Sequence, residues 1–219
     1  MVPTDPPPAE APKASGARFV VGVSGASGAA YTLRLVEQLL LGGHELHVVV
    51  SEYGQRLLHD ELDIKRVDLE SFCPHLAGSV AGETLRSRFI AHPNKDVGAV
   101  IASGSFLHRG MVIVPCSSTS LGAIATGSGS NLLSRAAAVT LKERRPLIVC
   151  HREMPLSLID IENMRSLTLA GATMCSPNPG FYLRPTSLHD VIDFVVGKVL
   201  DLLGLEHALK TRWEDARER

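Results

Sequence analysis

The sequence predicts an α/β protein built on a doubly wound parallel sheet. Two observations lead to this fold class. Short runs of β-branched residues recur along the chain, as is typical of strands buried on both faces of a parallel sheet. Segments with apolar residues at helical spacing separate these runs. Strands that alternate with helices in this way imply a sheet covered by helices on both faces.

The first two strands and the helices after them are clear from local pattern. Residues 18–24 (RFVVGVS) are a short β-branched run that ends at a turn, 25–28 (GASG). Leucines recur at helical spacing over residues 29–41, and paired glycines then stop that helix. Residues 45–50 (ELHVVV) form the second strand, and a helix follows over about residues 52–60.

The middle of the chain is harder to interpret. Residues 62–109 show mixed patterns, with an expected strand near 88–91 and a loop at 102–105 (ASGS). Residues 111–115 (MVIVP) are again a clear buried strand.

The remaining elements complete the alternation. Helices are expected over residues 119–126, 131–143 and 158–170, with strands at 147–150 and 172–175. Ser187 caps a final helix that runs to about residue 203 and has an apolar stripe for packing on the sheet: Val191, Ile192, Val195, Val196, Val199 and Leu200. The whole predicts one flavodoxin-like, Rossmann-like domain of three layers.

Size and composition set the domain organisation. The chain has 219 residues, which suits one domain, at residues 18–203. Residues 1–17 are expected to be a disordered leader rich in proline and alanine, and residues 204–219 a charged C-terminal extension. A net charge of −1 gives no overall attraction to nucleic acid or to an anionic membrane. No apolar run reaches the roughly 18 residues of a membrane span.

The cysteines and histidines point to no metal site. The four cysteines are scattered, without a C-x-x-C pair or zinc spacing, so we expect reduced thiols and a cytoplasmic location. The nine histidines form no ligand pattern, and we expect His44 and His47 at the surface.

Candidate site residues follow the strands. The turn at residues 22–28 opens a helix, whose free amides and positive dipole end suit an anion, although a tight turn without a ligand remains an alternative. Ser51 ends the second strand and is at least as well explained as a helix N-cap. Residues 116–120 (CSSTS) suit either a hydrogen-bonding cradle or a helix cap.

Charged residues add a second group of candidates. Arg135 and Lys142 lie seven residues apart, so they share a helix face. Arg152 and Glu153 end the strand at 147–150, where an arginine can clamp phosphate and a glutamate can move a proton; a structural salt bridge is the alternative. Tyr182 follows a rigid turn at residues 177–180 and is otherwise a packed tyrosine. Lys198, on the final helix, could instead face solvent.

Together these segments resemble the flavin prenyltransferases of the UbiX type. The resemblance covers about residues 18–213. Its most specific carriers are the combination of LKERRPL with a following R-E-x-P and PGFY, and it also includes VGVSGASGAAYTLRL, IASGSF and MVIVPCSSTSL.

The resemblance implies an enzyme, its substrates and its partners. Members bind FMN in a flavodoxin-like fold, assemble as homododecamers and move a dimethylallyl group from dimethylallyl phosphate to reduced FMN. Alkylation at N5 is followed by ring closure at C6, without a metal. The product, prenylated FMN, is the cofactor of UbiD-type decarboxylases.

The resemblance also assigns residues. The implied flavin-binding positions are Gly25, Ala26, Ser27, Ser51, Ser103, Ser117, Ser118, Thr119, Ser120 and Arg152. The implied prenyl-phosphate pocket contains Arg135, Lys142, Arg152, Glu153, Tyr182 and Lys198. Glu153, Ser27 and Lys142 are the catalytic candidates. Many members have arginine where Lys198 stands, which replaces a bidentate clamp with a point charge.

Two other functions fit parts of the pattern. A flavin-dependent cysteine decarboxylase would share the fold, but its members resemble one another in a Pro-Ala-Met-Asn segment, where residues 176–182 here read SPNPGFY. A flavin carrier without catalysis would need only the three loops and would leave Lys142, Glu153 and Tyr182 unexplained.

Overall fold

A six-stranded parallel sheet forms the centre of the molecule. The computed structural model describes residues 16–211. Within them the strand order is β3-β2-β1-β4-β5-β6, and all neighbours are parallel. The predicted doubly wound sheet is confirmed. The strands are β1 (Arg18–Val23), β2 (Glu45–Val50), β3 (Phe89–Pro93), β4 (Met111–Cys116), β5 (Leu147–His151) and β6 (Thr173–Met174).

The order of the strands indicates where a ligand would bind. Without the edge strand β3, the order β2-β1-β4-β5-β6 is the flavodoxin-like arrangement, and β3 extends it to the order of a Rossmann layer. The chain winds outward from β1 through β2 to β3, and then continues on the other side of β1 with β4. Ligands of such sheets bind beyond the carboxyl ends of the two strands at this reversal. Here those strands are β1 and β4.

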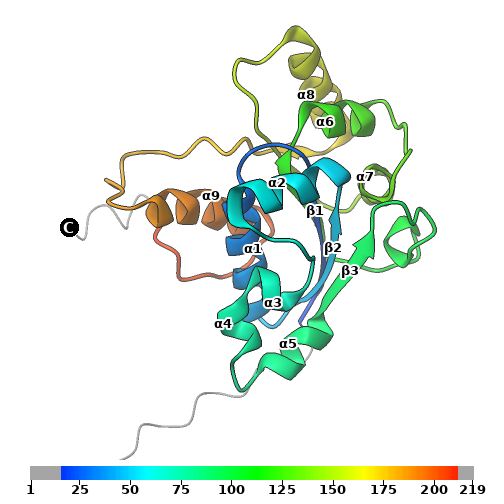
Figure 1. Cartoon of the computed structure of the whole chain (residues 1–219). Coiled ribbons are helices and arrows are strands. Elements are labelled where there is room, and N and C mark those ends of the chain that lie inside the picture. The colour runs from blue at the N-terminus through cyan, green and yellow to red at the C-terminus, as the bar shows by residue number, and fades with distance from the viewer. Residues whose placement is uncertain (1–15, 212–219) are drawn as a thin grey trace, which may run out of the picture.

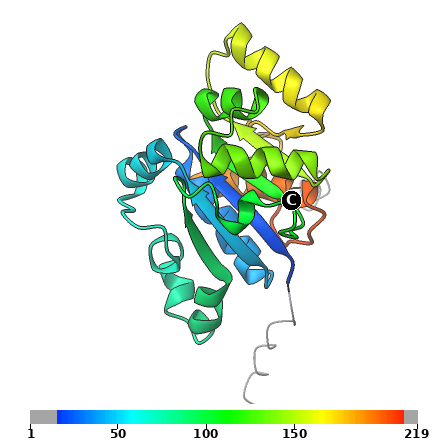
Figure 2. The ribbon, with the colours of Figure 1, turned by 90° about the vertical axis from the view of Figure 1, so that its right-hand side faces the viewer.

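Helices cover both faces of the sheet (Figures 1 and 2). The α1 and α9 helices pack on one face and the α6 and α7 helices on the other. No helix among residues 16–211 combines the length and apolar character needed to cross a bilayer. The helices are α1 (Ala29–Leu41), α2 (Glu52–Leu62), α3 (Leu69–Phe72), α4 (Pro74–Ala77), α5 (Gly82–Arg88), the 3₁₀ turn η1 (Val100–Ala102), α6 (Ser118–Ala125), α7 (Leu132–Lys142), α8 (Leu158–Ala170) and α9 (Leu188–Leu202).

The apolar strand runs are explained by burial on two faces. Successive strand residues point to opposite sides of a sheet. In β2, Val48 belongs to the core cluster under α1, whereas Val49 belongs to the cluster under α7, and both are fully buried. A strand in this position can therefore carry a continuous run of valines rather than an apolar–polar alternation.

The segment at residues 62–109 contains short elements that the sequence pattern did not resolve. The α3 and α4 helices have four residues each, and η1 has three. A helix of one turn is too short to display a 3.6-residue period, so its apolar residues cannot be recognised as a stripe. The strand expected near residues 88–91 is present as β3.

The prediction that His47 lies at the surface is wrong. It belongs to β2, its residue is 5% exposed, and its ring packs edge-on against Phe106 at 4.6 Å between centroids. Its Nδ1 lies 2.8 Å from His92 Nε2, and its Nε2 lies 3.0 Å from Glu45 Oε1. Two polar partners satisfy the buried imidazole, which is how a histidine is tolerated inside a strand. His44 is half-buried.

The expected terminal segments lie largely beyond the described residues. Residues 1–15 of the expected leader and residues 212–219 of the expected extension are outside the range. Residues 204–211 are described, and Leu205 and Leu209 pack against the core cluster under α9. The start of the expected extension therefore contributes to the core of the domain.

Candidate active site

The loops after β1 and β4 are joined at the crevice. Ser24 follows β1 and is fully buried. Its amide donates to Pro115 O at 3.1 Å, and its Oγ accepts a 2.8 Å hydrogen bond from the Ser117 amide. The Ser24 and Ser117 hydroxyls are 3.3 Å apart. These bonds fix the glycine-rich turn and the CSSTS turn, which lie far apart in sequence, as neighbours.

The amino terminus of α1 holds an anion from the chain itself. The amides of Gly28 and Ala29 donate to the Glu61 carboxylate, at 3.1 Å and 2.9 Å to Oε2. Gly28 has φ 127°, which favours glycine, and turns the chain into the helix. Free amides at a helix start bind anions readily. The Glu61 carboxylate therefore satisfies the first amides of α1 from within the chain.

Two more helices begin at the same edge of the sheet. The Ser51 Oγ accepts from the Gly54 amide at 3.0 Å, and the Ser117 Oγ accepts from the Ser120 amide at 3.3 Å. Both serines are therefore N-caps, of α2 and α6 respectively. With α1, three helix starts follow β1, β2 and β4, so their positive dipole ends are gathered at the carboxyl edge.

Arg152 belongs to this edge. Its amide donates to Cys116 O at 3.1 Å, and its Nε donates to Ser27 O at 3.1 Å. These contacts place the guanidinium beside the turn that opens α1. Glu153 comes next and is exposed, and its Oε1 accepts from the Met154 amide at 3.1 Å. The structure thus brings Ser27, Arg152 and Glu153 to one place, and a salt bridge between the last two is not what holds them.

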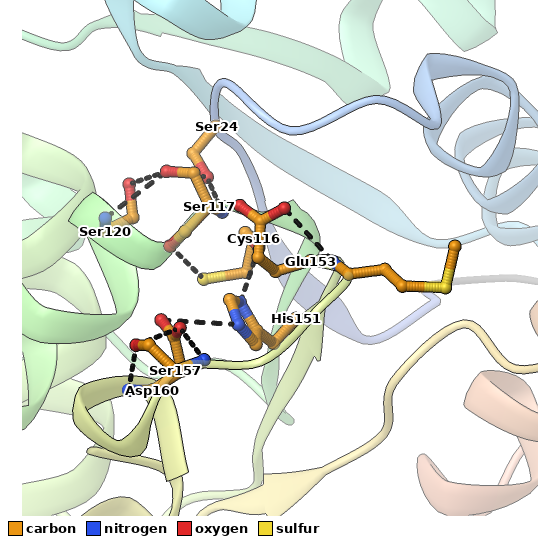
Figure 3. A network of polar contacts seen from close by, with 9 residues as sticks. Ser24, Cys116, Ser117, Ser120, His151, Glu153, Ser157 and Asp160 are labelled. Atoms are coloured by element: carbon orange, nitrogen blue, oxygen red, sulfur yellow. Dashed lines mark hydrogen bonds and ion pairs between the residues drawn. The ribbon is translucent and has the colours of Figure 1, made fainter. Parts of the chain in front are cut away.

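A buried polar network supports the site from below (Figure 3). His151 is 1% exposed, and its Nδ1 lies 3.0 Å from Cys116 O. Its Nε2 faces Asp160 Oδ1 at 3.8 Å, too far for a hydrogen bond. Asp160 accepts from the Ser157 hydroxyl at 2.6 Å in a capping box of α8. His151 therefore joins β5 to β4, and its Nε2 edge lies against the capped start of α8.

Hydrogen bonding stabilises the ionised form of Asp160. Bonds from the Ser118 hydroxyl, then from the Ser157 hydroxyl and amide, lower the pKa of Asp160 to about 2, and His151 adds to the effect. Ser118 is the first residue of α6. The carboxylate therefore also ties the CSSTS turn to α8. Thr119 next to it is exposed at the mouth of the turn.

Lys142 and Ser103 lie at the opposite edge of the sheet. The α7 helix begins beside Asn94, which follows β3, because the Leu132 amide donates to Asn94 O at 2.8 Å. It ends just before β5, and Lys142 pairs there with Glu143. Arg145 donates to Gly104 O at 2.8 Å, which holds the loop containing Ser103 at this amino edge.

Arg135 is exposed on the first turn of α7, nearer the carboxyl edge. Seven residues of helix separate it from Lys142 by about 10 Å along the axis. The two residues share a face, as predicted, but they lie at different heights on the sheet.

Tyr182 and Lys198 lie on the α9 side. The Tyr182 hydroxyl donates to Thr211 O at 3.1 Å, and its ring packs edge-on against Phe194 of α9. Lys198 is exposed on α9, near Cys175. The structure brings these two residues to the same helix, whereas Arg135 and Lys142 belong to the opposite face.

Comparisons with known proteins agree with this geometry. The flavoprotein family model matches residues 9–200. A flavin prenyltransferase UbiX of Halalkalibacterium halodurans is 44% identical over 91% of this chain and 95% of its own length. This chain belongs to the UbiX family of flavin prenyltransferases.

Solved structures of this family share the fold. One, described as AnUbiX (PadA1) in complex with FMN and dimethylallyl pyrophosphate, has a TM-score of 0.78 at 36% identity, covering 90% of this chain and 97% of that chain. Another, a dodecameric FMN-dependent UbiX-like decarboxylase from Escherichia coli O157:H7, also has a TM-score of 0.78 at 36% identity, covering 90% and 98%. The resemblance found in the sequence motifs is confirmed.

Sequence reasoning missed the residues that organise the site. Ser24 was part of the candidate turn at residues 22–28 but its link to Ser117 was not recognised, and Glu61 lay just after the helix expected over about residues 52–60. Neither has a local signal, because each acts on a segment more than 30 residues away. Asp160 did have one, since Ser157 and Asp160 have the S-x-x-D spacing of a capping box. Within residues 16–211 no group of three His, Cys, Asp or Glu side chains could hold a metal ion.

The first test concerns Glu61. We expect Glu61→Ala to lower the free energy of unfolding by about 1 kcal/mol, because α1 loses the carboxylate that satisfies its first amides. Urea unfolding at neutral pH measures this as a lower midpoint with an unchanged slope. Glu162→Ala is the control, since its carboxylate makes only an exposed 3.7 Å contact with Arg165. Equal midpoints for the two variants would contradict the capping role.

The second test concerns Asp160. Its folded pKa, about 2, lies below the ordinary value of 3.8, so the carboxylate stabilises the fold above about pH 4, and this contribution is lost as pH falls toward 2. The contribution at neutral pH is about 2 kcal/mol. Asp160→Asn should therefore be less stable at pH 7 and lose less stability between pH 4 and pH 2.5. Urea unfolding across this range measures the slope, and a slope equal to wild type would count against it.

Proposed function

We propose that this chain transfers a dimethylallyl group from dimethylallyl phosphate to reduced FMN. The observation that carries the proposal is the carboxyl-edge site, where three helix starts gather beside Arg152 and the amides of one already bind a carboxylate. A family member at 44% identity carries the name flavin prenyltransferase, and a related structure holds FMN with dimethylallyl pyrophosphate.

The residues at this edge fit a flavin phosphate. A phosphate needs amide and hydroxyl donors and positive charge. The amides of Gly28 and Ala29, the hydroxyls of Ser27 and the CSSTS turn, and the Arg152 guanidinium supply them. A Cβ on Gly25 would lie 2.5 Å from the Tyr53 side chain, so the turn requires glycine to let α2 approach. The flavin-binding set proposed from this geometry is Gly25, Ala26, Ser27, Ser51, Ser117, Ser118, Thr119, Ser120 and Arg152.

The charged residues suit the departure of a phosphate. Reduced FMN, when bound, supplies the electron-rich N5 and C6 atoms that accept the prenyl carbon. Cleavage of the allylic C–O bond puts negative charge on the leaving phosphate, and Arg152 with Lys198 would stabilise that charge. Glu153 is exposed at the crevice, and its remaining carboxylate oxygen is available to accept a proton. Tyr182 would orient the phosphate only by exchanging the hydrogen bond that its hydroxyl donates to Thr211 O.

A complete pocket needs more than one copy of the chain. Lys142 and Ser103 lie at the amino edge of the sheet, whereas Arg152 and Glu153 lie at the carboxyl edge. One copy cannot bring both sets to one ligand. We infer that a neighbouring subunit contributes Lys142 and Ser103, in an assembly such as the dodecamer described for the Escherichia coli relative.

The wider setting follows from the same proposal. Prenylated FMN would pass to a UbiD-type decarboxylase. The cysteines within residues 16–211 are unpaired, which supports a reducing compartment, and we propose the cytoplasm. We also propose that residues 18–203 form the functional domain, preceded by a leader and followed by a charged extension.

The decisive experiment is an anaerobic incubation with reduced FMN and dimethylallyl phosphate, followed by mass spectrometry of the released flavin. The proposal expects a flavin heavier by one dimethylallyl unit. Dimethylallyl pyrophosphate in a parallel reaction determines whether the donor is strictly the monophosphate. Recovery of unmodified FMN in both reactions would refute prenyl transfer and leave a carrier or a decarboxylase.

The third prediction concerns Glu153. Glu153→Gln should retain FMN binding and lose about 10²–10⁴-fold in turnover, because the amide cannot accept the proton. Flavin fluorescence titration gives the affinity, and the mass assay gives the rate. Glu52→Gln, an exposed glutamate on the first turn of α2, is the matched control. Turnover within a few-fold of wild type would remove Glu153 from the chemistry.

The fourth prediction tests the shared pocket. Lys142→Ala and Glu153→Gln should each be nearly inactive alone. Mixed assemblies made by co-expression should recover about a quarter of wild-type activity, because random mixing restores one site in four when the two residues come from different copies. If both residues acted from the same copy, each site would carry one defect and mixing would restore nothing.

A further inference from the structure

Two cysteines face each other on neighbouring strands. Ile148 pairs with Thr173 and Val149 with Met174 in the parallel β5–β6 ladder, and the Cys175 amide donates to Val149 O at 2.9 Å. The next pair in this register is Cys150 and Cys175. Neighbouring strands are about 4.8 Å apart. A disulfide spans Cα separations of about 4.4–6.8 Å, and the usual spacing of paired strands falls within that range.

The two side chains point to the same face of the sheet. Cys150 belongs to the core cluster under α1 and α9, and Cys175 packs against the edge of that cluster. The two thiols are close enough to shift each other's pKa. Cys150 is fully buried, whereas Cys175 is half-buried. Cys175 is therefore the more accessible of the two cysteines, and Cys150 lies in the core.

The local charges make Cys175 the reactive partner. The hydrogen bond from the Cys150 thiol, together with the Lys198 ammonium, lowers the pKa of Cys175 to about 7. The pKa of Cys150 is raised well above its ordinary value by the same hydrogen bond and by burial. Burial also raises the pKa of Cys73 and of Cys116 to about 12. Because the thiolate is the nucleophile, the environment favours Cys175 among the four cysteines.

We propose that Cys150 and Cys175 form a reversible disulfide when the protein meets hydrogen peroxide. The Cys175 thiolate attacks one peroxide oxygen, the O–O bond breaks, and hydroxide leaves a sulfenic acid on Cys175. Cys150 gives its proton to that hydroxide, and its sulfur then attacks the Cys175 sulfur. The S–O bond breaks and hydroxide leaves, taking up a proton as water. In total two thiols lose two electrons, and one peroxide becomes two waters.

The bond would connect two parts of the molecule that carry ligand-binding groups. Cys150 is two residues before Arg152, and Cys175 opens the segment that leads to Tyr182. The disulfide would fix the end of β5 to the start of this segment. Reduced flavins release peroxide when oxygen reaches them, so the oxidant would arise at the enzyme itself. That source of peroxide rests on the proposed function; the disulfide does not.

The experiment is peptide mapping of the purified full-length protein after treatment with hydrogen peroxide. Non-reducing digestion and mass spectrometry should detect one cross-linked peptide pair containing Cys150 and Cys175, and dithiothreitol should release both free thiols. Cys73→Ala should form the same cross-link. Cys150→Ala should instead accumulate sulfenic acid on Cys175, which dimedone labels.

Three results would overturn the proposal. The first is that Cys150 and Cys175 remain free thiols after peroxide has oxidised methionines elsewhere. The second is a disulfide that involves Cys73 or Cys116. The third is irreversible oxidation of Cys175 in wild type at the same rate as in Cys150→Ala. None of these readouts uses flavin or prenyl donor, so failure here is distinct from failure of the proposed function.

Discussion

The junction of β1 and β4 is the constraint on which the site depends. All carboxyl ends of a parallel sheet lie at one edge. A ligand binds there between the two strands at which the chain changes its direction of winding, which are β1 and β4. Ser24 closes this junction with a buried hydroxyl that bonds the Ser117 amide. Because that bond fixes the glycine-rich turn against the CSSTS turn, the starts of α1 and α6 share one crevice.

The charges of the site are arranged in two layers. The upper layer contains Ser27, Arg152 and Glu153, which are accessible to a ligand. The lower layer is the buried network of His151 and Asp160, which joins β4, β5, α6 and α8. Preorganised donors stabilise developing charge without reorganising during the reaction. The lower layer supplies that rigidity, since Asp160 is held by several hydrogen bonds at once.

The fold could be predicted from sequence because strands buried on both faces consist of continuous apolar runs, as the valines of β2 illustrate. The Gly25–Gly28 turn and the Arg152–Glu153 pair were also recognisable, since each follows a strand. What could not be predicted was distance through space. Lys142 shares a helix face with Arg135, and the pattern alone did not reveal that the helix carries Lys142 to the far edge of the sheet. Likewise, no sequence pattern near Glu61 predicts its hydrogen bonds to the start of α1.

That bond changes how ligand binding should be understood. The start of α1 already holds the Glu61 carboxylate, so its first amides have a hydrogen-bond acceptor even when no ligand is bound. A phosphate bound at these amides, as proposed, would displace the Glu61 carboxylate, and its net affinity would be the difference between two similar interactions. The start of α1 can therefore fold before any ligand binds, and the Glu61 carboxylate would return to these amides when a ligand leaves.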